Sequence, residues 1–226
     1  TNTNSAANFA NGYVDNLASA GIKEVRDAVF LHGYNEPVLL ILHEVEATWT
    51  GIYSEKKDTC ALTALSLNLS AKRHPKIWGA TKLPSDAYAL VACPSSGGAL
   101  VLCQGMVLYY EQGQQAGIVL SQAALPSGDG APPPPLEFDM SQPPEKVAGE
   151  YANKHVRDVH PAAVSECIKF CDKSMAESNL ECDAARATWL NDNTALLCLK
   201  HGQLLLLLLE KRGGSVTIKV AKAGSA

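Results

Sequence analysis

The sequence predicts an all-β fold of short antiparallel strands, and two observations support this. Short apolar runs recur along the chain, separated by turns rich in Gly, Pro, Asn and Ser. A repeated unit, a strand, a Gly-containing turn and a strongly apolar strand, occurs at residues 30–42, 91–102 and 196–209. Such repetition is typical of a β-propeller, a sandwich or a barrel. Because the second strand of each unit is apolar on both faces, it suits a strand packed between adjacent sheets.

The first strands flank a turn. Residues 25–31 and 38–43 are apolar runs separated by a Gly- and Pro-containing turn at 32–37. In a third run at 60–69, Leu65, Leu67 and Leu69 lie at every second position, as expected for a strand.

Later runs continue the pattern along the chain. The run of six leucines at 204–209 fits a buried helical segment equally well by periodicity, but its short length and the flanking Gly202 and Gly213 favour a strand. The further predicted strands are 88–93, 99–103, 106–110, 117–122, 187–190, 194–199 and 216–220.

Composition divides the chain into four parts. Residues 1–20 are predicted to form a flexible lead-in, and residues 21–122 and 182–222 carry the strands. Residues 123–181 form a predicted insertion, Pro-rich because four prolines follow one another at 132–135. Its second half, from 145, is predicted to be partly helical, since an apolar face at helical spacing follows Pro161: Val164, Ile168, Cys171 and Met175.

The overall composition bounds the function. The 226 residues are 46% hydrophobic and 19% charged, which is enough to bury a core, and the formal net charge is −4. This charge argues against a broad basic face for nucleic acid. The longest apolar run is six residues, whereas a membrane helix needs roughly 20. The chain starts at Thr1 without a signal-like segment, so we expect an internal fragment of a longer protein.

The seven cysteines indicate a reducing compartment, because their number is odd and no secretory signal is visible. Most lie in apolar runs, where Cys behaves as a small hydrophobic residue. The spacing of Cys167 and Cys171, with Cys182, His155 and His160 nearby, allows a zinc site, but it lacks the short recurrent spacing of structural zinc ligands. No metal or other cofactor is therefore predicted.

Motifs for catalysis are not found in the sequence. There is no phosphate-binding loop, nucleophile elbow or metalloprotease helix motif. His32, Tyr34 and Glu36 sit together, but the glycine and proline among them favour a structured turn over a site. No catalytic residue is therefore predicted, and the chain is not expected to be an enzyme.

One basic and aromatic cluster is a candidate RNA contact: Lys72, Arg73, Lys76 and Trp78. Such clusters bind single strands by base stacking and phosphate contact. In the alternative, which we favour, Trp78 packs between sheets and the charges are solvated.

The order of several motifs resembles a known family. His32-Gly33-Tyr34 with Glu36-Pro37 leads the series, and the other motifs are residues 39–42, Thr48-Trp49, Asp58-Thr59-Cys60, residues 64–68, His74-Pro75 with Ile77-Trp78, and Thr188-Trp189 before the leucine run. In this order they are similar to the N-terminal β-propeller region of the large scaffold subunit of the cleavage and polyadenylation specificity factor. The resemblance covers roughly residues 22–122 and 182–220. The large damaged-DNA-binding protein of ubiquitin ligases and a splicing-factor 3b subunit share that wider family.

The resemblance implies a fragment of a WD40-like β-propeller with several four-stranded antiparallel blades. It implies a nuclear, non-enzymatic scaffold for pre-mRNA 3′-end processing. Expected partners are a WD-repeat subunit, a zinc-finger subunit and the endonuclease subunit, with pre-mRNA contacted mostly through them. The alternatives are a related propeller scaffold of a ubiquitin ligase or of the spliceosome, or a direct RNA-binding module.

Overall fold

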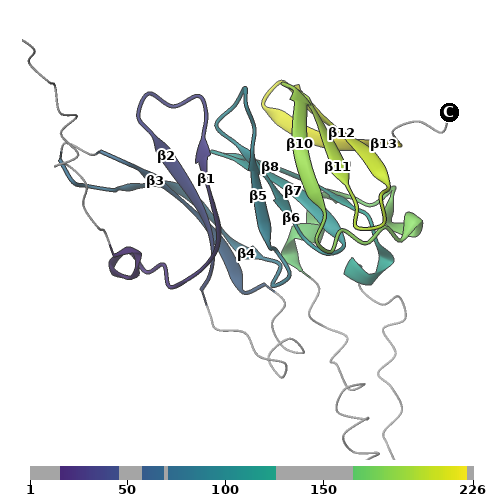
Figure 1. The fold of residues 1–226 in the computed structure, drawn as a ribbon, viewed down its shortest axis with the longest axis horizontal. Helices are drawn as coiled ribbons and strands as arrows, with labels where there is room; N and C mark the ends of the chain where they lie inside the picture. The colour runs from purple at the N-terminus through teal and green to yellow at the C-terminus, as the bar shows by residue number, and fades with distance from the viewer. Residues whose placement is uncertain (1–15, 46–57, 69–70, 126–164, 223–226) are drawn as a thin grey trace, which may run out of the picture.

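The computed structural model describes residues 16–45, 58–68, 71–125 and 165–222, and in these residues the fold is all-β. Three sheets stand side by side along the molecule in chain order (Figure 1). The described helical segments are short 3₁₀ turns. None of them is long or apolar enough to cross a membrane. The all-β class and the four-stranded antiparallel pattern predicted from the sequence are confirmed.

The first sheet is a meander of four antiparallel strands. It contains β1 (Glu24–Leu31), β2 (Val38–Glu44), β3 (Cys60–Ser66) and β4 (Lys76–Leu83) in that order. The turn between β1 and β2 needs Gly33, whose φ is +78°.

The second sheet repeats the meander with β5 (Ala89–Ala92), β6 (Ala99–Leu102), β7 (Met106–Glu111) and β8 (Gln114–Val119). A fifth strand, β9 (Cys171–Asp172), pairs in parallel with β8. This short strand returns to the sheet after residues 126–164, which include the Pro-rich stretch and lie outside the described residues.

The third sheet is again a four-stranded antiparallel meander. Its strands are β10 (Arg186–Asn191), β11 (Thr194–Cys198), β12 (Leu204–Arg212) and β13 (Ser215–Lys222). The leucine run is therefore a strand, as its length and flanking glycines predicted.

The sheets pack face to face through two apolar cores. Leu40 and Leu62 of the first sheet pack with Val101 and Leu108 of the second. The opposite face of the second sheet packs on the third sheet. In this core, the second sheet contributes Leu100, Tyr109 and Ile118, and the third contributes Leu197, Leu205 and Leu207. Strands β6 and β7 are consequently buried on both faces, which explains why their sequences are apolar at nearly every position.

The helix expected in residues 145–181 is not formed in the described part of that range. Ile168 lies in a 3₁₀ turn, η5 (Glu166–Lys169), and Cys171 lies in β9. Met175 precedes a second turn, η6 (Ala176–Ser178), which ends at Asn179 with φ +46°. Ile168 and Cys171 pack in the core between the first two sheets, whereas Met175 packs against the core between the second and third sheets. The apolar spacing of these residues therefore does not reflect one helical face. Val164 and Pro161 lie outside the described residues.

The described end of the predicted lead-in packs on the first sheet. A 3₁₀ turn, η2 (Leu17–Ala20), is capped by the Asn16 side chain. Ile22 then packs against Ile41 and Leu65 on the face that points away from the second sheet. Residues 1–15, like Trp49, lie outside the described residues.

Candidate interface at the ends of the sheets

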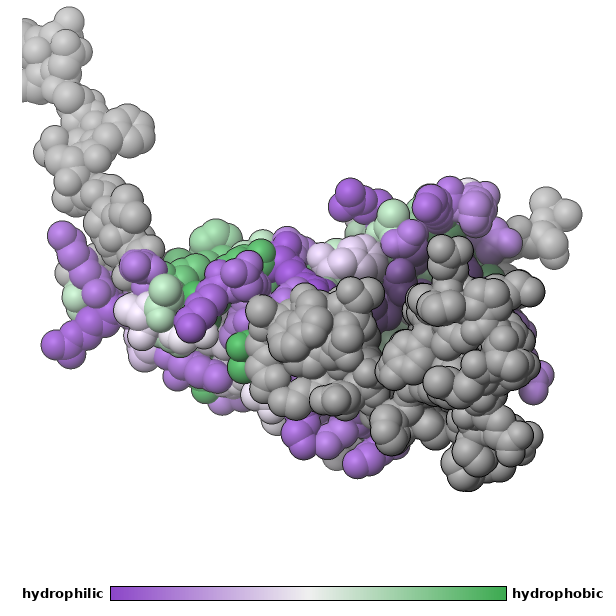
Figure 2. Space-filling view, turned by 90° about the horizontal axis from the view of Figure 1, so that it is seen from below, coloured by the Kyte–Doolittle hydropathy of each residue, from purple (hydrophilic) through white to green (hydrophobic). Residues whose placement is uncertain are grey.

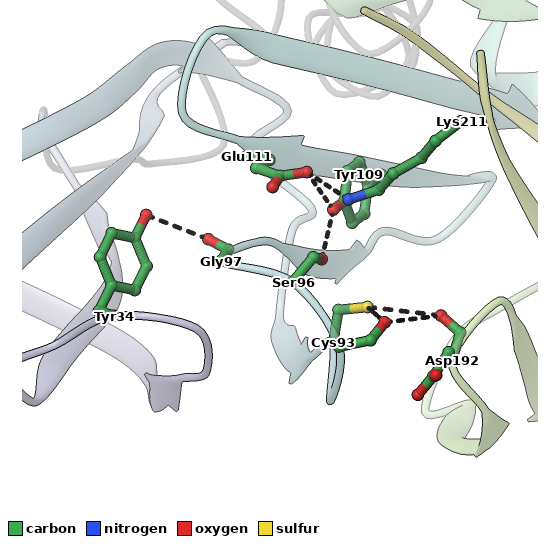
Figure 3. Close-up of polar contacts among 9 residues, drawn as sticks. Tyr34, Cys93, Ser96, Gly97, Tyr109, Glu111, Asp192 and Lys211 are labelled. Atoms are coloured by element: carbon green, nitrogen blue, oxygen red, sulfur yellow. Dashed lines mark hydrogen bonds and ion pairs between the residues drawn. The ribbon is translucent and has the colours of Figure 1, made fainter.

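The first hairpin turn of each sheet reaches the first hairpin turn of the next. The Tyr34 hydroxyl, in the β1–β2 turn, donates to the carbonyl of Gly97, in the β5–β6 turn, over 3.3 Å. The Ser95 hydroxyl, in that second turn, donates to the carbonyl of Asp192, in the β10–β11 turn, over 3.1 Å. Figure 3 shows the contact between Tyr34 and Gly97. We call this end of the three sheets the hairpin end.

A partly buried network joins the second and third sheets at the hairpin end (Figure 3). The Tyr109 hydroxyl donates to Glu111 Oε2 over 2.7 Å and accepts from the Ser96 hydroxyl at 2.9 Å. Lys211 of the third sheet lies 2.6 Å from the same carboxylate oxygen, with its ammonium 5.4 Å from the centre of the Tyr109 ring. Burial, together with the bond to the Glu111 carboxylate, raises the pKa of Tyr109 far above its usual value. The network consists of a neutral phenol and one ion pair. Because it links side chains of the second sheet to Lys211 of the third, it holds these two sheets in alignment.

Trp78 packs at the contact between the first two sheets. Its ring is partly buried against the first core, and its Nε1 donates to the Tyr34 hydroxyl over 2.8 Å. The same hydroxyl donates to Gly97, so Trp78 is part of the inter-sheet contact. This is the packing role that the sequence analysis favoured for Trp78, and the RNA contact through its ring stays a prediction.

The three cations of the predicted RNA contact lie close together on the turn before β4. Lys72, with φ +50°, and Arg73 belong to the turn, Arg73 pairs with Asn68 across it, and Lys76 opens β4. All three side chains are exposed. In the part of the chain that the structure describes, the side chains of Arg73 and Lys76 form no ion pair.

The described cysteines of the zinc site that the sequence analysis considered and disfavoured, Cys167, Cys171 and Cys182, do not converge. Cys171 donates its thiol hydrogen to the Cys167 carbonyl over 3.0 Å, whereas Cys182 lies in the other core. His155 and His160 lie outside the described residues. Burial raises the pKa of the Cys171 thiol to about 12 and that of Cys182 to about 12, so both behave as neutral core groups. Among the described residues, no three His, Cys, Asp or Glu side chains are grouped to hold a metal ion.

The opposite end of the sheets carries a second set of contacts around an open depression of about 950 Å³. Arg26, at the start of β1, donates to the carbonyls of Ser85 and Ala87 in the loop before β5. Tyr88, just before β5, donates to the carbonyls of Cys182 (2.6 Å) and Ala185 (3.1 Å) in the loop before β10. A side chain near the start of one sheet therefore binds two carbonyls that precede the next.

Asp86 is one of the titratable groups that line this depression. Burial raises the pKa of its carboxyl, although the backbone amide of Gln104 donates to it over 3.1 Å. No described base or nucleophile lies in hydrogen-bond contact with it. Its geometry is that of a loop anchor.

Sequence reasoning did not find these inter-sheet anchors. It placed Tyr34 in a structured turn but gave it no partner. No sequence pattern singles out the anchors Arg26, Tyr88 and Ser95. Each binds a carbonyl that is more than sixty residues away in the chain but adjacent in the fold.

Comparison with known proteins places this geometry in a family. The chain is 36% identical over 212 residues, 93% of its length, to cleavage and polyadenylation specificity factor subunit 1 of Arabidopsis thaliana. It is 31% identical over 206 residues to the probable subunit 1 of rice, and 32% identical over 195 residues to that of Drosophila melanogaster. The chain belongs to the cleavage and polyadenylation specificity factor subunit 1 family, as one segment of it. No family model matches the chain.

The subunit 1 relatives are much longer than this chain. It spans 12% of the Arabidopsis and rice proteins and 13% of the Drosophila protein. The resemblance predicted from the order of motifs is confirmed, and the three repeated sheets fit the β-propeller region that it implied.

Proposed function

We propose that this chain forms part of a non-enzymatic scaffold in pre-mRNA 3′-end cleavage and polyadenylation, acting in the nucleus. The observation that carries the proposal is the 36% identity, over 93% of the chain, to a protein named cleavage and polyadenylation specificity factor subunit 1. The geometry supports a scaffold, because the polar side chains at both ends of the sheets align neighbouring sheets.

The scaffold would support recognition of the polyadenylation signal through other subunits. The partners we propose are a WD-repeat subunit, a zinc-finger subunit and the endonuclease subunit. Indirect contact with pre-mRNA is supported by the net charge of −4 and by the engagement of Trp78 with Tyr34.

Two other functions are tested by the same experiments. A related propeller scaffold of a ubiquitin ligase or of the spliceosome would keep the fold and change the partners. A direct RNA-binding module would rely on the exposed cations Lys72, Arg73 and Lys76.

The proposal is tested by depleting the full-length protein from nuclear extract and measuring cleavage of a reporter pre-mRNA at its polyadenylation site. We expect cleavage to fall on depletion and to return when the purified protein is added back with its co-purifying subunits. The purified protein alone should cleave no RNA. Cleavage that continues at its full rate after complete depletion would refute the proposal.

A further inference from the structure

The depression opposite the hairpin end adjoins a smaller recess of about 240 Å³, and the two share wall residues that include Asp86, Gln104 and Asp183. Four parts of the chain line the recess: the loop before β5, the β6–β7 turn, the 3₁₀ turn η4 (Gln122–Ala124) and the segment before β10. Figure 2 views the molecule from this end, where hydrophilic residues, in purple, make up much of the described surface. A recess beside a wider depression can take one side chain of a ligand whose main chain lies outside it.

The described lining of the recess carries negative charge only. It contains three carboxylates, those of Asp86, Glu181 and Asp183, and no Lys, Arg or His. Asp86 and Glu181 take part in no ion pair among the described residues. Asp183 lies 3.5 Å from Lys200, but both side chains are more than half exposed, so this pair contributes little. Among the described residues, therefore, no cation inside the recess balances its charge.

Backbone hydrogen bonds hold the three carboxylates in place. The amide of Gln104 donates to Asp86 over 3.1 Å, and the carbonyl of Gln104 accepts from the amide of Cys182 at 2.7 Å. Because Cys182 lies between Glu181 and Asp183, the β6–β7 turn ties all three acidic positions together. A site that is fixed before its ligand arrives binds at a lower entropic cost.

The Asp86 carboxyl is partly buried and has no ion-pair partner among the described residues. Burial raises the pKa of Asp86, because its charged form is poorly solvated. Arg26 lines the wider depression, but its guanidinium already binds Glu44 and two backbone carbonyls. A ligand cation beside Asp86 would offset the cost of burying this charge.

The chemistry of the recess favours an arginine or lysine side chain over a metal ion. Ala123 and Ala124 of η4 add an apolar wall beside the carboxylates. Arg and Lys side chains pack an apolar stem against such a wall and carry the charge at its end. Among the described residues, no three metal-ligating side chains are grouped to hold a metal ion. The wider depression leaves room for the main chain that carries the side chain.

We propose that this end of the sheets docks a basic segment of a partner protein, with one arginine or lysine side chain in the recess between Asp86, Glu181 and Asp183. Arginine is the better fit, because the five N–H donors of its guanidinium can reach more than one carboxylate. The formal net charge of −4 also suits a positively charged partner. The inference goes beyond the proposed function and holds for any complex in which the protein serves, so its failure would leave the proposed function untouched.

Photocrosslinking in the intact complex identifies the docked segment. The full-length protein carries p-benzoylphenylalanine in place of Gln122, an exposed residue of η4 next to the recess, and is purified with its bound subunits. We expect crosslinks to one segment of a partner subunit, with an arginine or lysine within a few residues of the crosslinked position. Crosslinks to RNA, to another part of the same protein or to a segment without a cation would overturn the proposal, as would the absence of crosslinks.

Binding of that segment as a synthetic peptide then tests the three carboxylates. Glu181→Gln combined with Asp183→Asn, two exposed positions, should weaken its binding to the full-length protein at least about fivefold. Asp86→Asn, which keeps an acceptor for the Gln104 amide, should weaken it about tenfold. Neither variant should weaken the binding of a peptide in which the cation is replaced by glutamine.

Asp192→Asn is the matched control, because it removes an exposed carboxylate at the hairpin end. It should change the affinity for the peptide by less than about twofold. All variants should keep the wild-type hydrogen-exchange protection of β5 and β10, which shows that they fold. Unchanged affinity in the recess variants would overturn the proposal. Equal weakening by Asp192→Asn would do so as well, in favour of a general attraction between a basic peptide and an acidic protein.

Discussion

Trp78 Nε1 donates to the hydroxyl of Tyr34 over 2.8 Å, at the point where that hydroxyl also reaches the Gly97 carbonyl. One phenol thereby joins an edge strand, a hairpin turn and the neighbouring sheet. The aromatic residue most suggestive of RNA stacking in the sequence is thus held by the fold itself.

Removing the Tyr34 hydroxyl should loosen the first inter-sheet contact. Tyr34→Phe should lower the opening free energy of β4 by about 1–2 kcal/mol, because Trp78 loses its acceptor and Gly97 its donor. Hydrogen exchange of the full-length protein measures this. Trp78→Phe is the matched variant, and the double variant should cost less than the sum of the two single changes. Strict additivity would show that the two groups do not interact.

The ion pair between Lys211 and Glu111 should contribute modestly. Their side chains are 35% and 23% exposed, so Lys211→Met should lower the opening free energy of β12 by only about 0.5–1 kcal/mol, less at high salt. Lys200→Met, which removes a more exposed pair with Asp183, is the control and should change it by less than about 0.3 kcal/mol. Equal effects of the two variants would contradict the assigned role of Lys211.

Stability should decline at alkaline pH. Burial raises the pKa of Cys60 to about 11 and that of Tyr88 to about 12, and it raises the pKa of Tyr110 further. These groups stay protonated in the folded chain, whereas in the unfolded chain thiols ionise near pH 9 and phenols near pH 10. Above pH 9 the folded state therefore binds more protons, and its stability falls as pH rises, by up to about 1.4 kcal/mol per pH unit for each group.

Thermal melting of the full-length protein between pH 8 and pH 11 tests this decline. Tyr110→Phe removes one of the groups and should make the fall in melting temperature less steep above pH 10. An unchanged slope in that variant would show that the Tyr110 phenol ionises equally in both states.

Gly117 should be intolerant of a side chain because β9 lies against it. An added Cβ would clash with Cys171 Sγ and stand 2.8 Å from Leu108 Cδ2. Gly117→Ala should therefore destabilise the second sheet by about 1–3 kcal/mol, as overpacking does. Adding Cys171→Ala should restore part of this loss, measured by exchange of β8. If the second change gives no recovery, β9 does not occupy this place.

Loss of the exposed cations should leave RNA binding nearly unchanged. Arg73→Ala with Lys76→Ala should alter the affinity of the full-length protein for a polyadenylation-signal RNA by less than about twofold, with the same salt dependence. Lys173→Ala is the matched control. A salt slope that falls by about 2 in the double variant would support the direct RNA-binding alternative.

The strands were predictable because their signals are local. The alternation in residues 60–69 and the glycines on either side of 204–209 each indicate a strand from a few neighbouring residues. The segment around Cys171 was not predictable in the same way, since its apolar spacing also fits a helix and only the parallel pairing with β8 decides otherwise. The anchors Arg26 and Tyr88 depend on carbonyls distant in the chain, so no window of sequence reveals them.

The most direct test of the scaffold is affinity purification of the full-length protein from nuclear extract, with its partners identified by mass spectrometry. We predict recovery of the polyadenylation endonuclease together with the WD-repeat and zinc-finger subunits. Recovery of ubiquitin-ligase or spliceosomal subunits in their place would contradict the proposed function while leaving the fold intact. Recovery of RNA without stable protein partners would contradict it in favour of direct RNA binding.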